Sequence, residues 1–416
     1  MGIPNACIAC FLVAAASGRA AAFASLALPC PRFAAHQQQR RVHSTSAHTS
    51  QKSSPSDAQQ AALERQRQQP PQQQQQWAKH ALLISSFSDG VVNSPDASSY
   101  LKLGLAKSLA AEQSRITEDQ VRESVLFSPC AGPSIDLLND LEDVDNVISS
   151  LSQSTAAMDI SHMERKADDV LKQLQLSSGD SGPMYCRILY IPTAMYALNP
   201  DSKNTPGKQR QRARADGKKR RTQVVNHVQD MLGDNVAVLA CTLDFDDGSI
   251  KQPVGSNDAD LFPSDGEEAF SSWRPHLIYV EGGNTFWLQH CMDKGDWTTD
   301  LVSACAGPDA YAVYCGKSAG AIVAGSMVDT ATWKGWDDPT VVPGRAAYKD
   351  WAGYRGLGFA GEAAVFPHMD DVWEELVGEK KSQLGDGSTV YCLREREACC
   401  IDGDTEELFV VSGEHY

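Results

Sequence analysis

The stretch that decides the fold is YAVYCGKSAGAIVAG, residues 311–325. Its first five residues are mostly apolar and typical of a buried strand, and small residues that suit a helix follow Gly320. Between them stands G-x-S-x-G, in which Gly316 and Gly320 leave room for a sharp strand-to-helix turn. Such a turn projects the Ser318 hydroxyl and directs the backbone N–H of Ala319 toward an oxyanion. The sequence therefore predicts a nucleophile elbow; the alternative is a tight packing turn without catalysis.

Apolar strands alternate with helices on the N-terminal side of this elbow. Strands are expected at 80–87, 186–192, 236–241, 276–280 and 311–315, and helices at 222–232, 285–292 and 321–325. Near-continuous apolar strands separated by helices indicate a mostly parallel sheet covered on both faces. We therefore expect an α/β fold with three layers, α/β/α. Short strands at 363–366, 389–393, 398–401 and 408–411 are expected to complete the sheet or to form a hairpin edge.

The sequence pattern of residues 94–182 differs from that of the rest of the chain. Helical spacing occurs at 100–112, 135–151 and 163–176, with Ser- and Gly-containing turns between these segments. We interpret 94–182 as a helical insertion into a folded domain that spans 77–416. A basic run at 208–221 is expected to form a loop leading into the helix at 222–232. It is either a solvated surface or a means of attracting an acidic substrate or surface.

The first 76 residues read as a targeting leader followed by a disordered low-complexity segment. A short apolar run at 7–16 precedes Ala20 and Ala22, which suit a signal-peptidase site before Phe23. No acidic residue occurs before Asp57, and Gln, Ser and Arg are frequent. The combination resembles the bipartite plastid-targeting leader of algae with complex plastids. We expect a plastid location; secretion with a disordered stalk is the alternative.

Composition excludes several classes of protein. The formal net charge is −16, which argues against nucleic acid as the main partner, because binding phosphates requires clustered Lys and Arg. Hydrophobic residues make up 42 %, enough for a full core, but no stretch is long and apolar enough for a membrane span. The 12 cysteines do not follow a zinc or disulfide framework. Adjacent Cys399 and Cys400 are expected on opposite faces of a strand. We expect no metal and no cofactor.

A second glycine-rich turn follows the strand predicted at 276–280. It reads Glu281-Gly-Gly-Asn-Thr285, and two glycines allow a backbone to approach a ligand closely. The Gly283 N–H is our candidate for the second donor of an oxyanion hole, beside that of Ala319. Asn284 or Thr285 can cap the next helix, and Asn284 is also a candidate for contacting substrate. The alternative is an ordinary strand–turn–helix connection.

A nucleophilic serine needs a base and a group that orients the base. Two histidines follow the elbow, His368 and His415, and His415 lies beside the C-terminus. His368 follows the apolar run at 363–366 after one proline, at the end of a predicted strand, and is therefore the candidate base. The residues alone leave the orienting acid open, with Glu395 favoured over its competitors Asp337, Asp338 and Glu397.

Three motifs together resemble one known family. GKSAGA around Ser318, GGNT at 282–285 and FPH before His368 are similar to motifs of the dipeptidase E and cyanophycinase family of serine peptidases, over about residues 187–413. The resemblance implies a flavodoxin-like, class I glutamine amidotransferase-like fold. It also implies a triad of Ser318, His368 and Glu395, with Asp337 near the substrate.

The resemblance leads us to expect a serine peptidase that hydrolyses small peptides, above all dipeptides with N-terminal Asp. One departure is the absence of an Arg shortly after His368; Lys317, Lys380 or Lys381 could meet an acidic side chain instead. The alternatives are a cyanophycinase-like exopeptidase on β-linked Asp–Arg, an esterase, and a catalytically silent relative that binds ligands or partners. The expected partner is a small peptide, with a homodimer as a further possibility.

Overall fold

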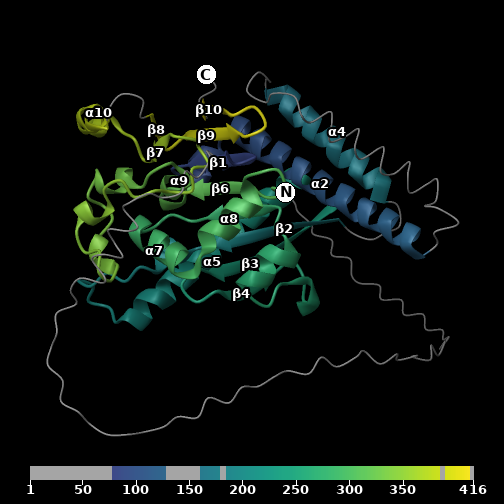
Figure 1. The fold of residues 1–416 in the computed structure, drawn as a ribbon, viewed down its shortest axis with the longest axis horizontal. Helices are drawn as coiled ribbons and strands as arrows, with labels where there is room; N and C mark the ends of the chain where they lie inside the picture. The colour runs from purple at the N-terminus through teal and green to yellow at the C-terminus, as the bar shows by residue number, and fades with distance from the viewer. Residues whose placement is uncertain (1–76, 128–159, 179–183, 385–388, 413–416) are drawn as a thin grey trace, which may run out of the picture. The chain divides into compact units, whose positions relative to one another are not determined.

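The computed structural model describes residues 77–127, 160–178, 184–384 and 389–412 (Figure 1). The leader expected at 1–76 and the helix expected at 135–151 lie outside these residues. The strands are β1 (His80–Ile84), β2 (Met184–Ile191), β3 (Val236–Asp244), β4 (Ser249–Val254), β5 (Leu277–Val280), β6 (Val313–Lys317), β7 (Ala364–Phe366), β8 (Val390–Cys392), β9 (Glu397–Asp402) and β10 (Glu407–Ser412). The α-helices are α2 (Pro95–Phe127), α4 (Ile160–Ser178), α5 (Pro206–Leu232), α6 (Gly266–Glu268), α7 (Thr285–Gly295), α8 (Trp297–Cys305), α9 (Ala319–Ala324) and α10 (Glu374–Gln383).

Eight strands form one sheet in the order β10-β9-β1-β6-β5-β2-β3-β4. The five central strands, from β1 to β3 in this order, are parallel. The antiparallel strands β9 and β10 complete one edge, and β4 completes the other. This confirms the expected α/β fold with a mostly parallel sheet. Because parallel strands all point the same way, the ends of β1, β5 and β6 open at one edge.

The two faces of the sheet bury two different sets of side chains. Alternation along β1 sends Ala81 and Leu83 to the core beneath α7, α8 and α9, and Leu82 and Ile84 to the core beneath α2, α4 and α5. Cys399 and Cys400 of β9 likewise belong to opposite cores, as the sequence predicts. Helices therefore cover both faces, as expected of buried parallel strands.

Helix α2 belongs to one of these cores. Tyr100 of α2 donates from its hydroxyl to the Ile401 carbonyl (2.6 Å), and its ring stacks on His80 of β1. A Cβ added to Gly104 would lie 2.1 Å from the His80 ring, so this glycine lets the helix press onto the strand. Helix α4 packs along α2 (Figure 1). That residues 94–182 are an insertion stays a prediction. Helix α2, which lies within this range, covers one face of the sheet. Within the described residues, no helix combines the length and apolarity needed to cross a bilayer.

Three segments differ from the expectation. The basic run at 208–221 is not a loop, because α5 begins at Pro206, where Thr205 accepts from the Lys208 N–H (3.4 Å) as N-cap. The strand β4 was not predicted, because its residues are largely polar and half-exposed at a sheet edge. Strands β7 and β8 do not join the main sheet but pair with each other in parallel.

A half-buried ionic network anchors α2 to the sheet away from the elbow. Arg187 of β2 donates to Glu112 Oε1 (2.5 Å), and His276 Nε2 lies 2.6 Å from Glu112 Oε2. Burial alone would raise the pKa of the Glu112 carboxyl, but the hydrogen bonds and charges of His276 and Arg187 lower it to about 2. A carboxyl whose pKa is lowered by folding stabilises the folded state at pH values above its ordinary pKa of about 4.5. This stabilisation is lost as the pH falls from there toward 2.

We therefore predict that Glu112→Gln lowers the free energy of unfolding by roughly 2 kcal/mol at pH 7. The deficit should shrink as the pH falls from about 4.5 toward 2, because the wild-type carboxylate then becomes protonated. Urea denaturation of both proteins at pH 7, 4 and 3 measures this. Equal stability at pH 7, or a deficit that does not change with pH, would contradict the prediction.

Candidate active site

Ser318 lies between β6 and α9 in a strained turn. Its φ of 49° and ψ of −106° are rare for a residue other than glycine. A Cβ added to Gly316 would lie 2.5 Å from the Gly320 carbonyl oxygen, and one added to Gly320 would lie 2.3 Å from the Val280 carbonyl oxygen. Both flanking positions therefore require glycine for the steric reason that the sequence motif indicates.

The predicted base and acid lie in a chain of hydrogen bonds with this serine. His368 Nε2 is 2.9 Å from Ser318 Oγ, and His368 Nδ1 is 2.5 Å from Glu395 Oε1. The competing acids are engaged elsewhere: Glu397 accepts from the Arg394 N–H and Asp338 from Thr340. The serine hydroxyl, the imidazole and the carboxylate thus follow one another as proton transfer from a serine to an oriented imidazole requires.

Contacts from three segments hold His368 in place. Its φ is 55°, and its N–H donates to Ser85 Oγ (2.8 Å), which follows β1 and in turn donates to the Leu393 carbonyl (2.9 Å). The Lys334 ammonium donates to the carbonyls of Pro367 (2.8 Å) and His368 (2.5 Å). The imidazole is thus fixed through its own backbone as well as through Glu395.

Lys334 sits in an aromatic cluster beside the histidine. Its Nζ lies 4.4 Å from the Trp336 ring centre, 4.3 Å from Phe366 and 5.4 Å from Trp373. Burial lowers the pKa of Lys334 to about 8, against the opposing charge of Glu395. Trp336 is 61 % exposed, and its ring centre is 5.9 Å from that of His368. Sequence reasoning missed Lys334 and Trp336, since they lie in a loop without a motif.

The glycine-rich loop after β5 packs directly against the serine. A Cβ on Gly282 would lie 2.8 Å from Ser318 Cβ, and Gly283, with a φ of 148°, lies against the Ala194 backbone. The Gly282 N–H is used, because it donates to Glu281 Oε1 (3.0 Å). In the part of the chain that the structure describes, the N–H groups of Gly283 and Ala319 donate to no protein acceptor. These are the two donors that the sequence singles out for an oxyanion hole.

Asn284 and Asp337 join the loop after α9 to the start of α7. Asn284 Oδ1 accepts from the Trp287 N–H (2.9 Å) as the α7 cap, and its amide donates to the Asp338 carbonyl (3.0 Å). Asp337 Oδ2 accepts from the Thr285 N–H (2.8 Å). Burial raises the pKa of Asp337, while the Thr285 hydrogen bonds and the His368 charge oppose this. Both side chains thus have structural partners, and their contact with substrate stays a prediction.

Lys317 faces a buried carboxylate. Its Nζ lies 2.7 Å from Glu281 Oε1, and its side chain is 17 % exposed. Lys317, Glu281 and Arg220 line part of a 180 Å³ cavity with Ser86 and Ser88. A substrate carboxylate would compete with Glu281 for Lys317, so the predicted substrate contact of Lys317 also stays a prediction. Sequence reasoning missed Glu281, although an acidic residue at the end of an apolar strand is a signal that could have found it.

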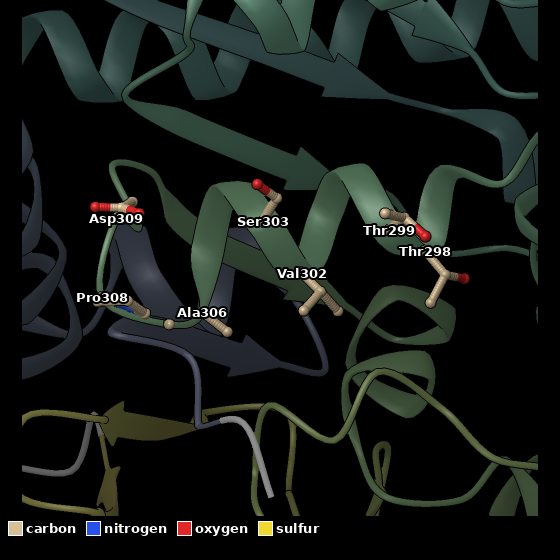
Figure 2. Close-up of a pocket in the computed structure, with 8 residues that line it drawn as sticks. Thr298, Thr299, Val302, Ser303, Ala306, Pro308 and Asp309 are labelled. Atoms are coloured by element: carbon tan, nitrogen blue, oxygen red, sulfur yellow. The ribbon is translucent and has the colours of Figure 1, made fainter. Parts of the chain in front are cut away.

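A larger hollow of 360 Å³ lies elsewhere, on the outer side of α8 (Figure 2). It is lined by Thr298, Thr299, Val302, Ser303 and the turn at 306–309. This turn leads into the start of β6, whereas Ser318 follows the end of that strand. The hollow is therefore separate from the serine site. Among the described residues, no group of His, Cys, Asp or Glu is placed to hold a metal ion.

Part of this chain, including the site, is similar to a known family. Residues 273–409, which contain Ser318, His368 and Glu395, match the model of Peptidase family S51. This bears out the resemblance to the dipeptidase E family. A crystal structure of a Listeria monocytogenes EGD-e protein, provisionally named a peptidase E, is similar at 14 % identity over 80 % of this chain and 98 % of that one. Its TM-score of 0.35 is too low to support a conclusion. The curated proteins include no match.

We predict that Lys334→Met slows the labelling of Ser318 by a fluorophosphonate probe about tenfold, a loss typical of a displaced catalytic group. The methionine keeps the apolar contacts with the aromatic cluster but cannot hold the His368 carbonyl. Lys294→Met is the matched control, because this exposed lysine binds Asp246 on the surface. Equal labelling rates for the wild type and Lys334→Met would show that His368 does not depend on Lys334.

Proposed function

We propose that this serine-type peptidase, whose residues 273–409 belong to family S51, hydrolyses dipeptides with an N-terminal aspartate through Ser318, His368 and Glu395. The observation that carries the proposal is the pair of hydrogen bonds at His368, to Ser318 Oγ at 2.9 Å and to Glu395 at 2.5 Å. The second bond makes Nδ1 the donor to the carboxylate, so that Nε2 is the free base.

The reaction proceeds in two halves. His368 Nε2 takes the Ser318 proton as Oγ attacks the peptide carbonyl, and the resulting imidazolium is stabilised by Glu395. His368 then returns the proton to the leaving amine, which leaves an acyl-enzyme on Ser318. Water, deprotonated by the same histidine, hydrolyses this ester and regenerates the serine.

The developing oxyanion is expected to lie between the N–H groups of Gly283 and Ala319. Two features support this: neither N–H has a protein acceptor among the described residues, and the Gly282 backbone packs against Ser318. Donors of this kind, held in place before the reaction, lower the barrier by roughly 3 kcal/mol each.

The preference for N-terminal aspartate rests on the resemblance to the dipeptidase E family and not on a described contact. Lys317 remains the candidate for binding the acidic side chain of the substrate, although in the structure Lys317 forms an ion pair with Glu281. Two alternatives remain distinct from this proposal: cleavage of β-linked Asp–Arg, and binding without catalysis.

The second residue of the substrate is expected to be apolar. His368 protonates the leaving amine, so side chains beyond its ring lie on the leaving-group side. Trp336 stands there with most of its surface exposed, and Trp373 contacts it edge to face at 5.7 Å. An aromatic surface in this position favours a substrate such as Asp-Leu over Asp-Gly.

The decisive test is a panel of α-Asp-Leu, β-Asp-Arg and Ala-Leu, incubated with the purified protein. We expect cleavage of α-Asp-Leu, a loss of at least a thousandfold in Ser318→Ala, and a loss of similar size in His368→Ala. Cleavage of β-Asp-Arg alone would favour the cyanophycinase-like alternative. No Ser318-dependent cleavage of any member would refute the dipeptidase proposal.

For Trp336→Ala we predict a change in selectivity. The ratio of kcat/KM for α-Asp-Leu to that for α-Asp-Gly should fall about tenfold, the usual value of a lost apolar contact. Trp336→Phe should retain most of the ratio. Trp287→Ala is the control, because it removes a half-buried tryptophan of α7 that packs against the core. A parallel loss on both dipeptides would mean that Trp336 supports the site without contacting the second residue.

A further inference from the structure

Glu281 is a buried carboxylate that the proposed mechanism does not use. It follows β5 and is 1 % exposed. Its Oε1 accepts from Lys317 Nζ (2.7 Å), from Arg220 Nη1 (3.0 Å) and from the Gly282 N–H (3.0 Å), and its Oε2 accepts from the Tyr190 hydroxyl (2.8 Å). A single carboxylate therefore gathers four donors from β2, α5, β6 and its own loop.

The donors lie on both sides of the candidate oxyanion hole. Gly282 precedes Gly283, whose N–H is one candidate oxyanion donor. Lys317 precedes Ser318 and Ala319, whose N–H is the other. The backbone of Glu281 is itself fixed, because its N–H donates to the Ile191 carbonyl (2.9 Å). The carboxylate thus connects the loop after β5 with the strand end that leads into the elbow.

We propose that Glu281 is a positioning residue that sets the separation of the Gly283 and Ala319 N–H groups. An oxyanion hole lowers the barrier only when its donors are already in place, and a misplacement of about 1 Å is costly. Two glycines give the 282–283 loop wide conformational freedom, so a contact that restrains it is needed. The inference rests on Ser318 acting as a nucleophile, but not on the identity of the peptide substrate.

The charges explain why a carboxylate fits this position. Burial would raise the pKa of Glu281, but Lys317 and Arg220 outweigh this effect and lower it. The ionised form is therefore present at neutral pH, where it accepts from all four donors. Glutamine would accept from fewer of them and would leave two cations without a counter-charge.

The test compares Glu281→Gln and Lys317→Met with the wild type on α-Asp-Leu and on p-nitrophenyl acetate. Active enzyme is counted by fluorophosphonate labelling of Ser318, so that misfolded protein does not enter the rate. The control is Glu112→Gln, which breaks a half-buried carboxylate network away from the elbow. A peptide boronate, which forms a tetrahedral adduct with serine, reports on the oxyanion hole.

In Glu281→Gln we expect kcat per labelled site to fall at least tenfold on both substrates, with KM within about threefold of the wild type. Boronate affinity should fall by a similar factor. Lys317→Met should show a smaller fall, again on both substrates. Glu112→Gln should lose stability and keep its kcat per labelled site.

Unchanged kcat per labelled site in Glu281→Gln would overturn the proposal. If that variant does not fold, Lys317→Met decides: an unchanged kcat per labelled site on p-nitrophenyl acetate would reject the positioning role, whatever the KM for α-Asp-Leu. If the wild type cleaves the ester but no dipeptide, the proposed substrate fails while the Glu281 comparison still stands on the ester. If neither the dipeptides nor the ester show hydrolysis that depends on Ser318, both proposals fail.

Discussion

The site depends on the close approach of the elbow backbone to β5. Gly320 touches the Val280 carbonyl, and Gly316 touches Gly320, at distances that exclude any side chain. Between these two glycines Ser318 has a φ of 49°, and its side chain lies beside Gly282. A strained residue persists only where its surroundings outweigh the strain, and here the surroundings are buried strands on both sides.

The predicted base and acid reach this serine from a separate two-stranded sheet. Strands β7 and β8 pair with each other, and their ends carry His368 and Glu395. Ser85, at the end of β1, accepts from the His368 N–H and donates to the Leu393 carbonyl, so the main sheet holds both segments. The imidazole orientation is therefore coupled to the same sheet edge that forms the elbow.

Two charged side chains beside the site, Lys334 and Glu281, restrain the backbone. The Lys334 ammonium donates to the His368 carbonyl, and the Glu281 carboxylate accepts from the Gly282 N–H in the loop beside Ser318. Each contact is charge-assisted and at least partly buried, and such hydrogen bonds are stronger than neutral ones. The result is a site whose donors and acceptors are held before substrate arrives, which is the condition for electrostatic stabilisation of a transition state.

Local patterns in the sequence determined the elbow, the alternation of strands and helices, and the choice of Ser318 and His368, because these depend on nearest neighbours and on period. The separate pairing of β7 with β8, and the contact of His368 with Glu395 among several nearby acids, were decided by tertiary structure. The same holds for Glu281, Lys334 and Trp336, whose proposed roles rest on contacts between segments far apart in the chain. A motif records which side chains are available; the long-range packing of the sheet and its loops decides which of them meet.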